Sequence, residues 1–132
     1  SRRSLLDQNY RLWGSFVVEA GGKTIFFGGD SGYADHFREV GELFPKIDYF
    51  LVGVGAFEPR WLMEHHHQNP EEAVRGFVES GAGVLIPMHY GTFDLTDEPP
   101  SWPLRQLGEA ASAAEVAERV RPLAINEALI IE

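Results

Sequence analysis

Short apolar runs alternate along this chain with segments in which apolar residues recur every three or four positions. Three of the runs are apolar at nearly every position and stop at turn-forming residues, a pattern that predicts buried strands. These runs occupy residues 23–28, 48–54 and 84–88. A further strand is predicted over residues 11–20, because Gly21-Gly22 after it is typical of a tight hairpin. We also expect a last strand over residues 128–131.

Two helices are predicted between these strands. The first spans residues 35–44 with one apolar face and ends at Pro45. The residues of that face are Tyr33, Phe37, Val40 and Phe44. The second helix begins after Asn69, which can cap it, and Glu72 three residues later completes a capping box. Gly81 is expected to end this helix.

The order of these elements predicts an α/β fold with a parallel sheet. Strands that alternate with helices are joined by right-handed crossovers, so their carboxyl ends meet at one edge of the sheet. Ligands bind at this edge in open α/β sheets. Asp30, residues 55–57 and His89 each follow a strand and are therefore expected there. Helical turns are predicted over residues 104–111 and 114–121, and no feature divides the chain into two domains.

Composition narrows the possible chemistry. The net charge of −9 opposes non-specific binding to nucleic acid or to anionic lipid headgroups. The chain has no cysteine, so a metal ion would have to be held by His, Asp or Glu. The longest apolar run, residues 49–57, is far shorter than the roughly 20 residues of a membrane-spanning helix. We therefore expect a globular domain without a transmembrane segment.

Asp30 and His89 are the first candidates for chemistry. Asp30 follows Gly28-Gly29, where the backbone can turn sharply, and His89 follows the strand over residues 84–88. A carboxylate and an imidazole at the ends of neighbouring strands suggest half of a metal site, since a catalytic zinc site has three protein ligands. The alternative is that Asp30 caps the following helix and that His89 is a hydrogen-bonded structural residue.

Three consecutive histidines, His65, His66 and His67, precede the capped helix. They cannot all face one point, so at most one or two of them would line a pocket. The alternative is a solvated polar loop.

The loop before these histidines is rich in large apolar side chains. Phe57, Trp61, Leu62 and Met63 would form a groove for an acyl chain at the active edge, or would cover the core where the loop folds back. Arg60 would meet a phosphate, or would pair with a carboxylate such as Glu58.

Five motifs occur in a fixed order and together give a specific resemblance. They are Leu12-Trp13-Gly14-Ser15, Phe27-Gly28-Gly29-Asp30-Ser31-Gly32-Tyr33, Gly55-Ala56-Phe57-Glu58-Pro59-Arg60-Trp61, His67-Gln68-Asn69-Pro70-Glu71-Glu72-Ala73 and His89-Tyr90-Gly91-Thr92-Phe93. Over about residues 2–107 the chain closely resembles the C-terminal half of the N-acyl-phosphatidylethanolamine-hydrolysing phospholipase D group. That group belongs to the metallo-β-lactamase fold superfamily.

The resemblance implies a fold and a metal centre. The fold would be the C-terminal half of a four-layer αβ/βα sandwich, which in the intact protein holds two zinc ions at the edge of its paired sheets. By the same resemblance Asp30 bridges both ions, His89 is a terminal ligand and His67 faces the substrate. His66 stands at a position that is Gln in relatives and is a candidate partner of His67.

The chain also departs from the family pattern. The motif His-x-His-x-Asp-His is absent, and the chain begins just after the place of a further ligand histidine. Residues 1–132 are therefore expected to be one partial domain whose N-terminal half is missing. Such a fragment would hold zinc weakly or not at all and would be inactive alone. It would self-associate or pair with its missing half, because half a sandwich exposes an apolar sheet face.

Three functions follow from these features. The first is a zinc-dependent phosphodiesterase of the phospholipase D type, which cleaves N-acyl-phosphatidylethanolamine-like lipids with metal-activated hydroxide. In it, Phe57 and Trp61 hold acyl chains, whereas His67, with His66 beside it, acts on a phosphoryl or leaving-group oxygen.

The second function is a hydrolase of the same fold that acts on a lactone, a cyclic phosphodiester or RNA, although the acidic charge argues against RNA. The third is a non-catalytic half-domain that binds a partner. We expect a cytoplasmic protein, peripheral at a membrane if its substrate is a lipid.

Overall fold

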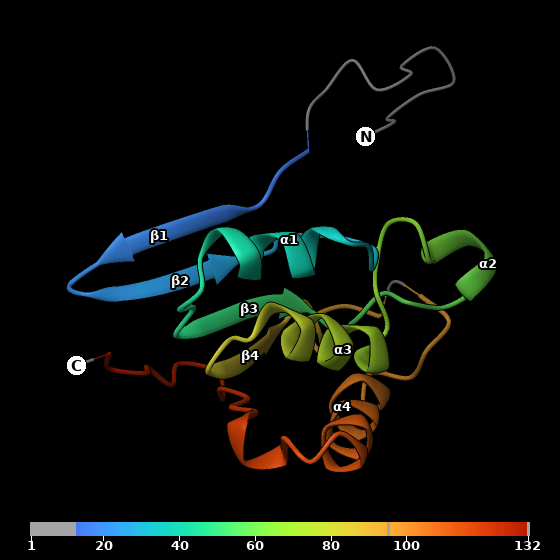
Figure 1. Ribbon diagram of the computed structural model, residues 1–132. Helices are drawn as coiled ribbons and strands as arrows, with labels where there is room; N and C mark the ends of the chain where they lie inside the picture. Colours follow the sequence, from blue (N-terminus) through green and yellow to red (C-terminus); the bar gives the residue numbers. More distant parts are fainter. Residues whose placement is uncertain (1–12, 95, 132) are drawn as a thin grey trace.

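Residues 13–94 and 96–131 are described by a computed structural model, which contains a four-stranded sheet with helices packed on one face (Figure 1). The strands, in their order across the sheet, are β1 (Phe16–Ala20), β2 (Lys23–Phe27), β3 (Tyr49–Gly53) and β4 (Val84–Met88). β1 is antiparallel to β2, whereas β2, β3 and β4 are parallel to one another. The predicted hairpin and parallel sheet are therefore confirmed, although β1 begins later than expected, at Phe16.

Helices follow β2, β3 and β4 along the chain. They are α1 (His36–Leu43), α2 (Arg60–Met63), α3 (Pro70–Ser80) and α4 (Trp102–Ala113), followed by the 3₁₀ helix η1 (Ala117–Arg119). α3 packs against both α1 and α4 and lies between them (Figure 1). Within the described part of the chain, none of these helices has the length and apolarity needed to cross a membrane.

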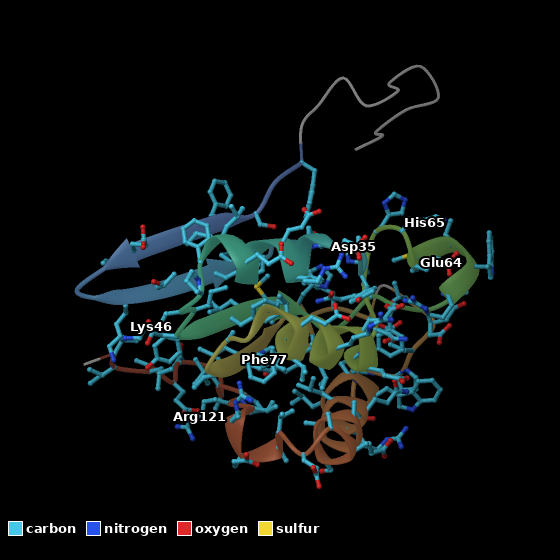
Figure 2. The ribbon with its side chains drawn as sticks, in the orientation of Figure 1. Asp35, Lys46, Glu64, His65, Phe77 and Arg121 are labelled. Carbon is cyan, nitrogen blue, oxygen red and sulfur yellow. The ribbon has the colours of Figure 1, made fainter. Side chains whose placement is uncertain are left out.

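Phenylalanine rings join the sheet to the helices. Phe26 of β2 and Phe50 of β3 are register partners, and their ring centroids lie 5.0 Å apart. Phe37 of α1 and Phe77 of α3 contact Phe50 with centroid distances of 5.5 and 6.0 Å, and Phe77 is labelled in Figure 2. All four rings are buried. The apolar face predicted for the first helix therefore packs on the sheet through Phe37.

The opposite face of the sheet carries apolar side chains that are open to solvent. Phe16 and Val18 of β1 are 66% and 49% exposed, and Phe27 of β2 is 39% exposed. Phe16 and Phe27 are register partners, so they share this face, and side-chain alternation puts them on the side away from Phe26. We refer to Phe16, Val18 and Phe27 as the open sheet face.

α3 begins and ends as the sequence predicts. The side chain of Asn69 accepts a hydrogen bond from the Glu72 N–H at 2.8 Å, and the Glu72 carboxylate accepts one from the Asn69 N–H at 2.8 Å. This reciprocal pair is the predicted capping box. At the other end, Gly81 adopts the left-handed conformation with φ 68°, which a glycine adopts at low cost.

The helices near the C-terminus differ from the prediction. α4 starts at Trp102, earlier than expected, because Pro103 suits the first turn of a helix. Of residues 114–121, only η1 is helical.

The expected strand over residues 128–131 is absent, and this prediction was wrong. The segment after η1 pairs with β4 only at a single bridge between Val120 and Leu85, where the Arg121 N–H donates to the Leu85 carbonyl at 2.8 Å. Pro87 follows in β4 and has no N–H with which to continue this ladder. Pairing therefore ends after one bridge.

Candidate metal centre

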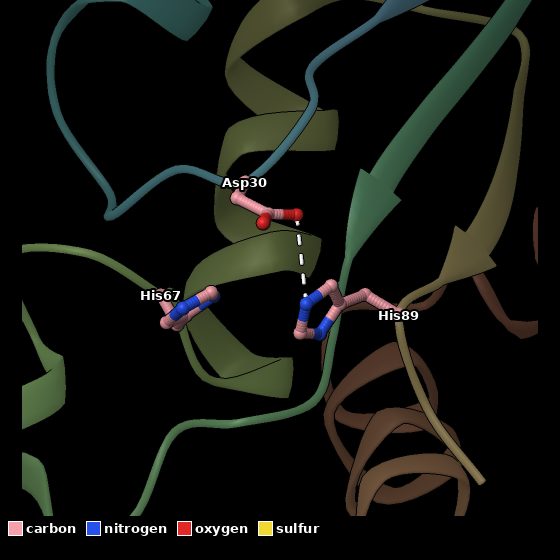
Figure 3. Close-up of side chains that lie close together, drawn as sticks. All are labelled: Asp30, His67 and His89. Carbon is pink, nitrogen blue, oxygen red and sulfur yellow. Dashed lines mark ion pairs between the residues drawn. The ribbon is translucent and has the colours of Figure 1, made fainter. Parts of the chain in front are cut away.

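Asp30 and His89 come from the carboxyl ends of β2 and β4, on either side of β3. The His89 Nε2 atom lies 3.5 Å from Asp30 Oδ1 (Figure 3). The side chains are 35% and 61% exposed, so both remain open to a ligand from solvent. The structure thus brings together the two residues that the sequence predicted at this edge.

The backbone conformation at the ends of both strands is unusual. Gly29 has φ 64°, and a Cβ atom on Gly28 would lie 2.9 Å from Cγ1 of Val52, so the turn after β2 depends on both glycines. The indole Nε1 of Trp13 donates to the Asp30 carbonyl at 2.6 Å and holds this turn from the other side. His89 has φ 61°, a left-handed conformation that non-glycine residues adopt mostly where the surroundings enforce it.

His67 reaches the same place from the segment between α2 and α3. Its carbonyl accepts a hydrogen bond from Arg60 Nη1 at 3.1 Å. Arg60 Nη2 also contacts both carboxylate oxygens of Glu72, at 2.8 and 2.9 Å, so the cap of α3 and the backbone of His67 are tied together. The Arg60 guanidinium therefore pairs with Glu72, whereas the Arg60 backbone N–H donates to Glu58 Oε2 at 3.0 Å. Contact of Arg60 with a phosphate stays a prediction.

Asp30, His67 and His89 form one group of potential metal donors. A donor atom of each lies within 4.8 Å of the donor atoms of the other two (Figure 3). The rings of His67 and His89 have their centroids 5.0 Å apart. Burial lowers the pKa of the His67 imidazole, and the neighbouring His89 lowers it further. A neutral imidazole is the form that binds a metal ion, so the donor set fits zinc chemistry.

The other two histidines of this segment lie outside the donor group. The His65 side chain is 82% exposed and lies 3.7 Å from Glu64, and Figure 2 shows both residues beside α2. His66 is exposed. Its partnership with His67 stays a prediction.

The predicted substrate-contacting residues occupy two different environments. Phe57 is 2% exposed and belongs to the core, whereas Trp61 on α2 is 78% exposed. Neither lines the cavity of about 310 Å³ that opens beside His89. Residues that do line it include Gly55, Ala56, Tyr90, Phe93, Glu98 and Pro103.

Two buried polar residues near the donor group were not indicated by the sequence. Gln68 is 1% exposed, and its backbone N–H donates to Ser31 while its side-chain Nε2 donates to Gly53, at 2.8 and 3.0 Å. It thereby links the segments next to Asp30 and His67 to the end of β3. Glu98 is 6% exposed and binds the loop after β3. Gln68 lies within the fourth motif, but that motif assigned it no role, and Glu98 lies outside the five motifs, so only the fold reveals what these two residues do.

Comparison with known proteins gives the family. The family described as "Beta-lactamase superfamily domain" matches residues 1–90. The chain belongs to this superfamily. It is 37% identical over 116 residues to N-acyl-phosphatidylethanolamine-hydrolyzing phospholipase D 1 of Caenorhabditis elegans, covering 86% of this chain and 33% of that protein. It is 38% identical over 101 residues to the mitochondrial phospholipase D of the same name from Saccharomyces cerevisiae, covering 74% and 22%.

These matches confirm the resemblance to the phospholipase D group that the five motifs predicted. The chain spans a third or less of the length of these two relatives. Among solved structures, a metallo hydrolase of Ignicoccus hospitalis superimposes with a TM-score of 0.66 at 22% identity, covering 89% of this chain and 45% of that one. This likeness confirms the predicted metallo-β-lactamase-type α/β fold.

Proposed function

We propose that this chain supplies part of the active site of a zinc-dependent hydrolase. The observation that carries the proposal is the convergence of Asp30, His67 and His89, whose donor atoms lie within 4.8 Å of one another. Carboxylate and imidazole donors, here Asp30 and His89, suit zinc, and no thiolate is available in a chain without cysteine. The names of the phospholipase D relatives and of the metallo hydrolase support the same chemistry.

The side chains of the donor group have distinct roles in this proposal. Asp30 and His89 would hold the metal ion, because they follow parallel strands and His89 Nε2 lies 3.5 Å from Asp30 Oδ1. A zinc ion in such a site offsets the charge of a phosphodiester and makes water nucleophilic near neutral pH. His67 has a lowered pKa and is therefore neutral near pH 7, so its N–H can orient a phosphoryl oxygen by hydrogen bonding.

The proposed substrate is a phosphodiester lipid of the N-acyl-phosphatidylethanolamine type. Two observations besides the relatives' names support it. The cavity beside His89 is partly lined by Tyr90, Phe93 and Pro103, which suit an apolar chain. Trp61 and Leu62 on α2 are 78% and 51% exposed, as expected of side chains that touch a lipid surface. We propose peripheral contact with a membrane on this basis, in a protein that is otherwise cytoplasmic.

Zinc binding tests the metal site. The protein expressed from its whole gene should hold about two zinc ions by elemental analysis, as in two-metal phosphodiesterases. Asp30→Ala and His89→Ala should each lower the zinc content, whereas His65→Ala removes an exposed imidazole of the same type and should not. The 132-residue chain alone should hold zinc weakly or not at all. An unchanged zinc content in both Asp30→Ala and His89→Ala would exclude this metal site.

A substrate panel tests the lipid. The zinc-loaded whole protein should release phosphatidic acid from N-acyl-phosphatidylethanolamine and should do so more efficiently than it cleaves a lactone, a cyclic phosphodiester or RNA. Cleavage of one of those three without release of phosphatidic acid would support a hydrolase activity but exclude the lipid as its substrate.

A non-catalytic half-domain that binds a partner is the second candidate function, and the open sheet face favours it. Monomeric proteins seldom leave such a patch uncovered, so a second copy or the other half of the sandwich is expected to cover it. The two functions are compatible if the partner completes the metal centre.

A further inference from the structure

Glu98 is a buried carboxylate that binds a loop about forty residues away in the sequence. Its side chain accepts hydrogen bonds from the N–H groups of Ala56, Phe57 and Glu58, at 2.6, 3.3 and 3.0 Å. The first two go to Oε1 and the third to Oε2, so both carboxylate oxygens are engaged. The residue is 6% exposed.

These hydrogen bonds set the conformation of the loop after β3. A buried carboxylate is tolerated only where hydrogen bonds replace its hydration, and charge-assisted bonds of this kind are the strong ones. Consecutive N–H groups that turn toward one point form a concave site for an anion, here filled by Glu98. Ala56 has φ 59°, which an alanine rarely adopts, and its N–H makes the shortest of the three bonds. The carboxylate thus offsets an unfavourable backbone conformation.

The same loop lies against His89. Gly55 precedes the bound N–H groups, and a Cβ atom on Gly55 would collide with the His89 carbonyl oxygen. Just before it, the Val54 N–H donates to the Met88 carbonyl at 3.0 Å. The backbone of His89 therefore lies against Gly55, and the three residues after Gly55 donate hydrogen bonds to Glu98.

Glu98 and His89 also share the cavity described above. The residues that line it also include Gly55 and Ala56 from the loop after β3 and Pro100 and Pro103 from the segment that follows Glu98. Glu98 links these two parts of the lining, because it immediately precedes the second in the sequence and its carboxylate accepts a hydrogen bond from Ala56 of the first.

We propose that Glu98 is a positioning residue that holds His89 and this cavity in place. Because its carboxylate oxygens are occupied by backbone N–H groups, Glu98 acts through the 55–58 loop and not by contact with metal or substrate. The link from this loop to His89 is structural and independent of metal, whereas its consequence for zinc binding rests on the proposed function.

Glu98→Gln tests the proposal, since it keeps the size of the side chain and replaces one acceptor oxygen by a donor. Asp97→Asn is the matched control, because it removes the same charge from the adjacent, exposed residue. In ¹H–¹⁵N spectra of the 132-residue chain without metal, Glu98→Gln should move the amide resonances of Ala56 and Glu58 upfield. It should also move the backbone and ring resonances of His89, and Asp97→Asn should leave these resonances in place.

A purely stabilising role predicts a different result. Glu98→Gln would then lower the unfolding temperature but leave the His89 resonances of the folded protein unchanged, and this outcome would overturn the proposal. In the unaltered chain the amides of Ala56 and Glu58 should exchange slowly with deuterium. Exchange at the rate of an open loop would overturn the proposal even if the variant failed to fold.

Zinc affinity then separates this proposal from the proposed function. If the whole protein binds zinc, Glu98→Gln should weaken binding by about tenfold or more, as for residues that orient metal ligands. If the whole protein binds no zinc but the His89 resonances move, the positioning role stands and the proposed function fails.

Discussion

His89 reaches Asp30 across β3, with 3.5 Å between His89 Nε2 and Asp30 Oδ1, although the two residues follow strands that are not adjacent. Gly53, the last residue of β3, lies beneath this contact. A Cβ atom there would lie 3.5 Å from the His89 Cβ and 3.9 Å from the Gly29 carbonyl oxygen. The absence of a side chain at Gly53 leaves space for the carboxylate and the imidazole to meet.

This relationship predicts a size limit at position 53. Gly53→Ala adds one atom at ordinary contact distance and should leave the His89 resonances and the zinc content of the whole protein nearly unchanged. Gly53→Val adds two further methyl groups and should push His89 away from Asp30, which lowers the zinc content. Equal zinc contents in the two variants, both folded by circular dichroism, would show that the space above β3 is not needed.

The cap of α3 should contribute measurably to stability. Asn69→Ala leaves the Glu72 N–H without its side-chain acceptor and should lower the free energy of unfolding by about 1 kcal/mol. Asn69→Asp keeps a hydrogen-bond acceptor at the same place and should lower the free energy of unfolding much less. Urea unfolding at pH 7 measures both, and an Asn69→Ala variant as stable as the unaltered chain would contradict the role of the cap.

Two helical glycines should respond to alanine with opposite signs. A Cβ atom on Gly76 of α3 would lie 2.7 Å from the buried ring of Phe37, so Gly76→Ala should destabilise the protein by about 1–3 kcal/mol through overpacking. Gly108 of α4 has open space around it, so Gly108→Ala should stabilise by about 0.5–1 kcal/mol through helix propensity. Thermal unfolding of the two variants provides the comparison, and a change of the same sign in both would refute the close α1–α3 contact.

The Tyr33–Glu79 pair should make stability depend on acidic pH. The Tyr33 hydroxyl donates to Glu79 Oε2 at 2.6 Å, and this hydrogen bond, with that from Arg75, lowers the pKa of the Glu79 carboxyl. A carboxyl group whose pKa is lower in the folded than in the unfolded state stabilises the protein at pH values above its unfolded-state pKa. This stabilisation is lost as the pH falls through the folded-state pKa.

Tyr33→Phe should therefore raise the pKa of Glu79 toward its ordinary value and lower stability more at pH 7 than at pH 3. The measurements are an NMR titration of the Glu79 carboxyl and unfolding at both pH values. Tyr49→Phe removes a hydroxyl from a tyrosine of β3 and serves as the control. An unchanged Glu79 titration in Tyr33→Phe would mean that the hydrogen bond does not form in solution.

The open sheet face should make the 132-residue chain associate with itself. Sedimentation should show dimers or larger species, and Val18→Glu should shift them toward the monomer by placing a charge on this face. Ser112→Glu adds the same charge at an exposed position of α4 and should leave the association unchanged. A monomer that binds no hydrophobic dye would contradict this prediction.

The sequence alone determined the parts of this protein that depend on neighbours along the chain. Strands apolar at nearly every position, the capping box at Asn69 and the glycines before Asp30 each follow from local geometry. The order of strands and helices permits few topologies, so it also predicted that Asp30 and His89 lie at one edge of the sheet. The five motifs added the family.

Only the tertiary structure decided how distant loops meet. His67 joins Asp30 and His89 because Arg60 and Glu72 hold its backbone, and no local pattern encodes that contact. Glu98 lies in a proline-rich loop with no sign of its role, since the N–H groups that it binds are about forty residues away.

The same reason explains the predictions that failed. Residues 128–131 have the composition of a strand, but a strand forms only where a neighbouring strand pairs with it, and after α4 the described chain pairs with β4 only at the bridge between Val120 and Leu85. For Phe57 the sequence left two alternatives open, a groove residue or a cover for the core, and its burial agrees with the second, since the loop after β3 folds back and is hydrogen-bonded to Glu98. Burial and pairing depend on the whole fold, whereas propensity and capping depend on a few adjacent residues.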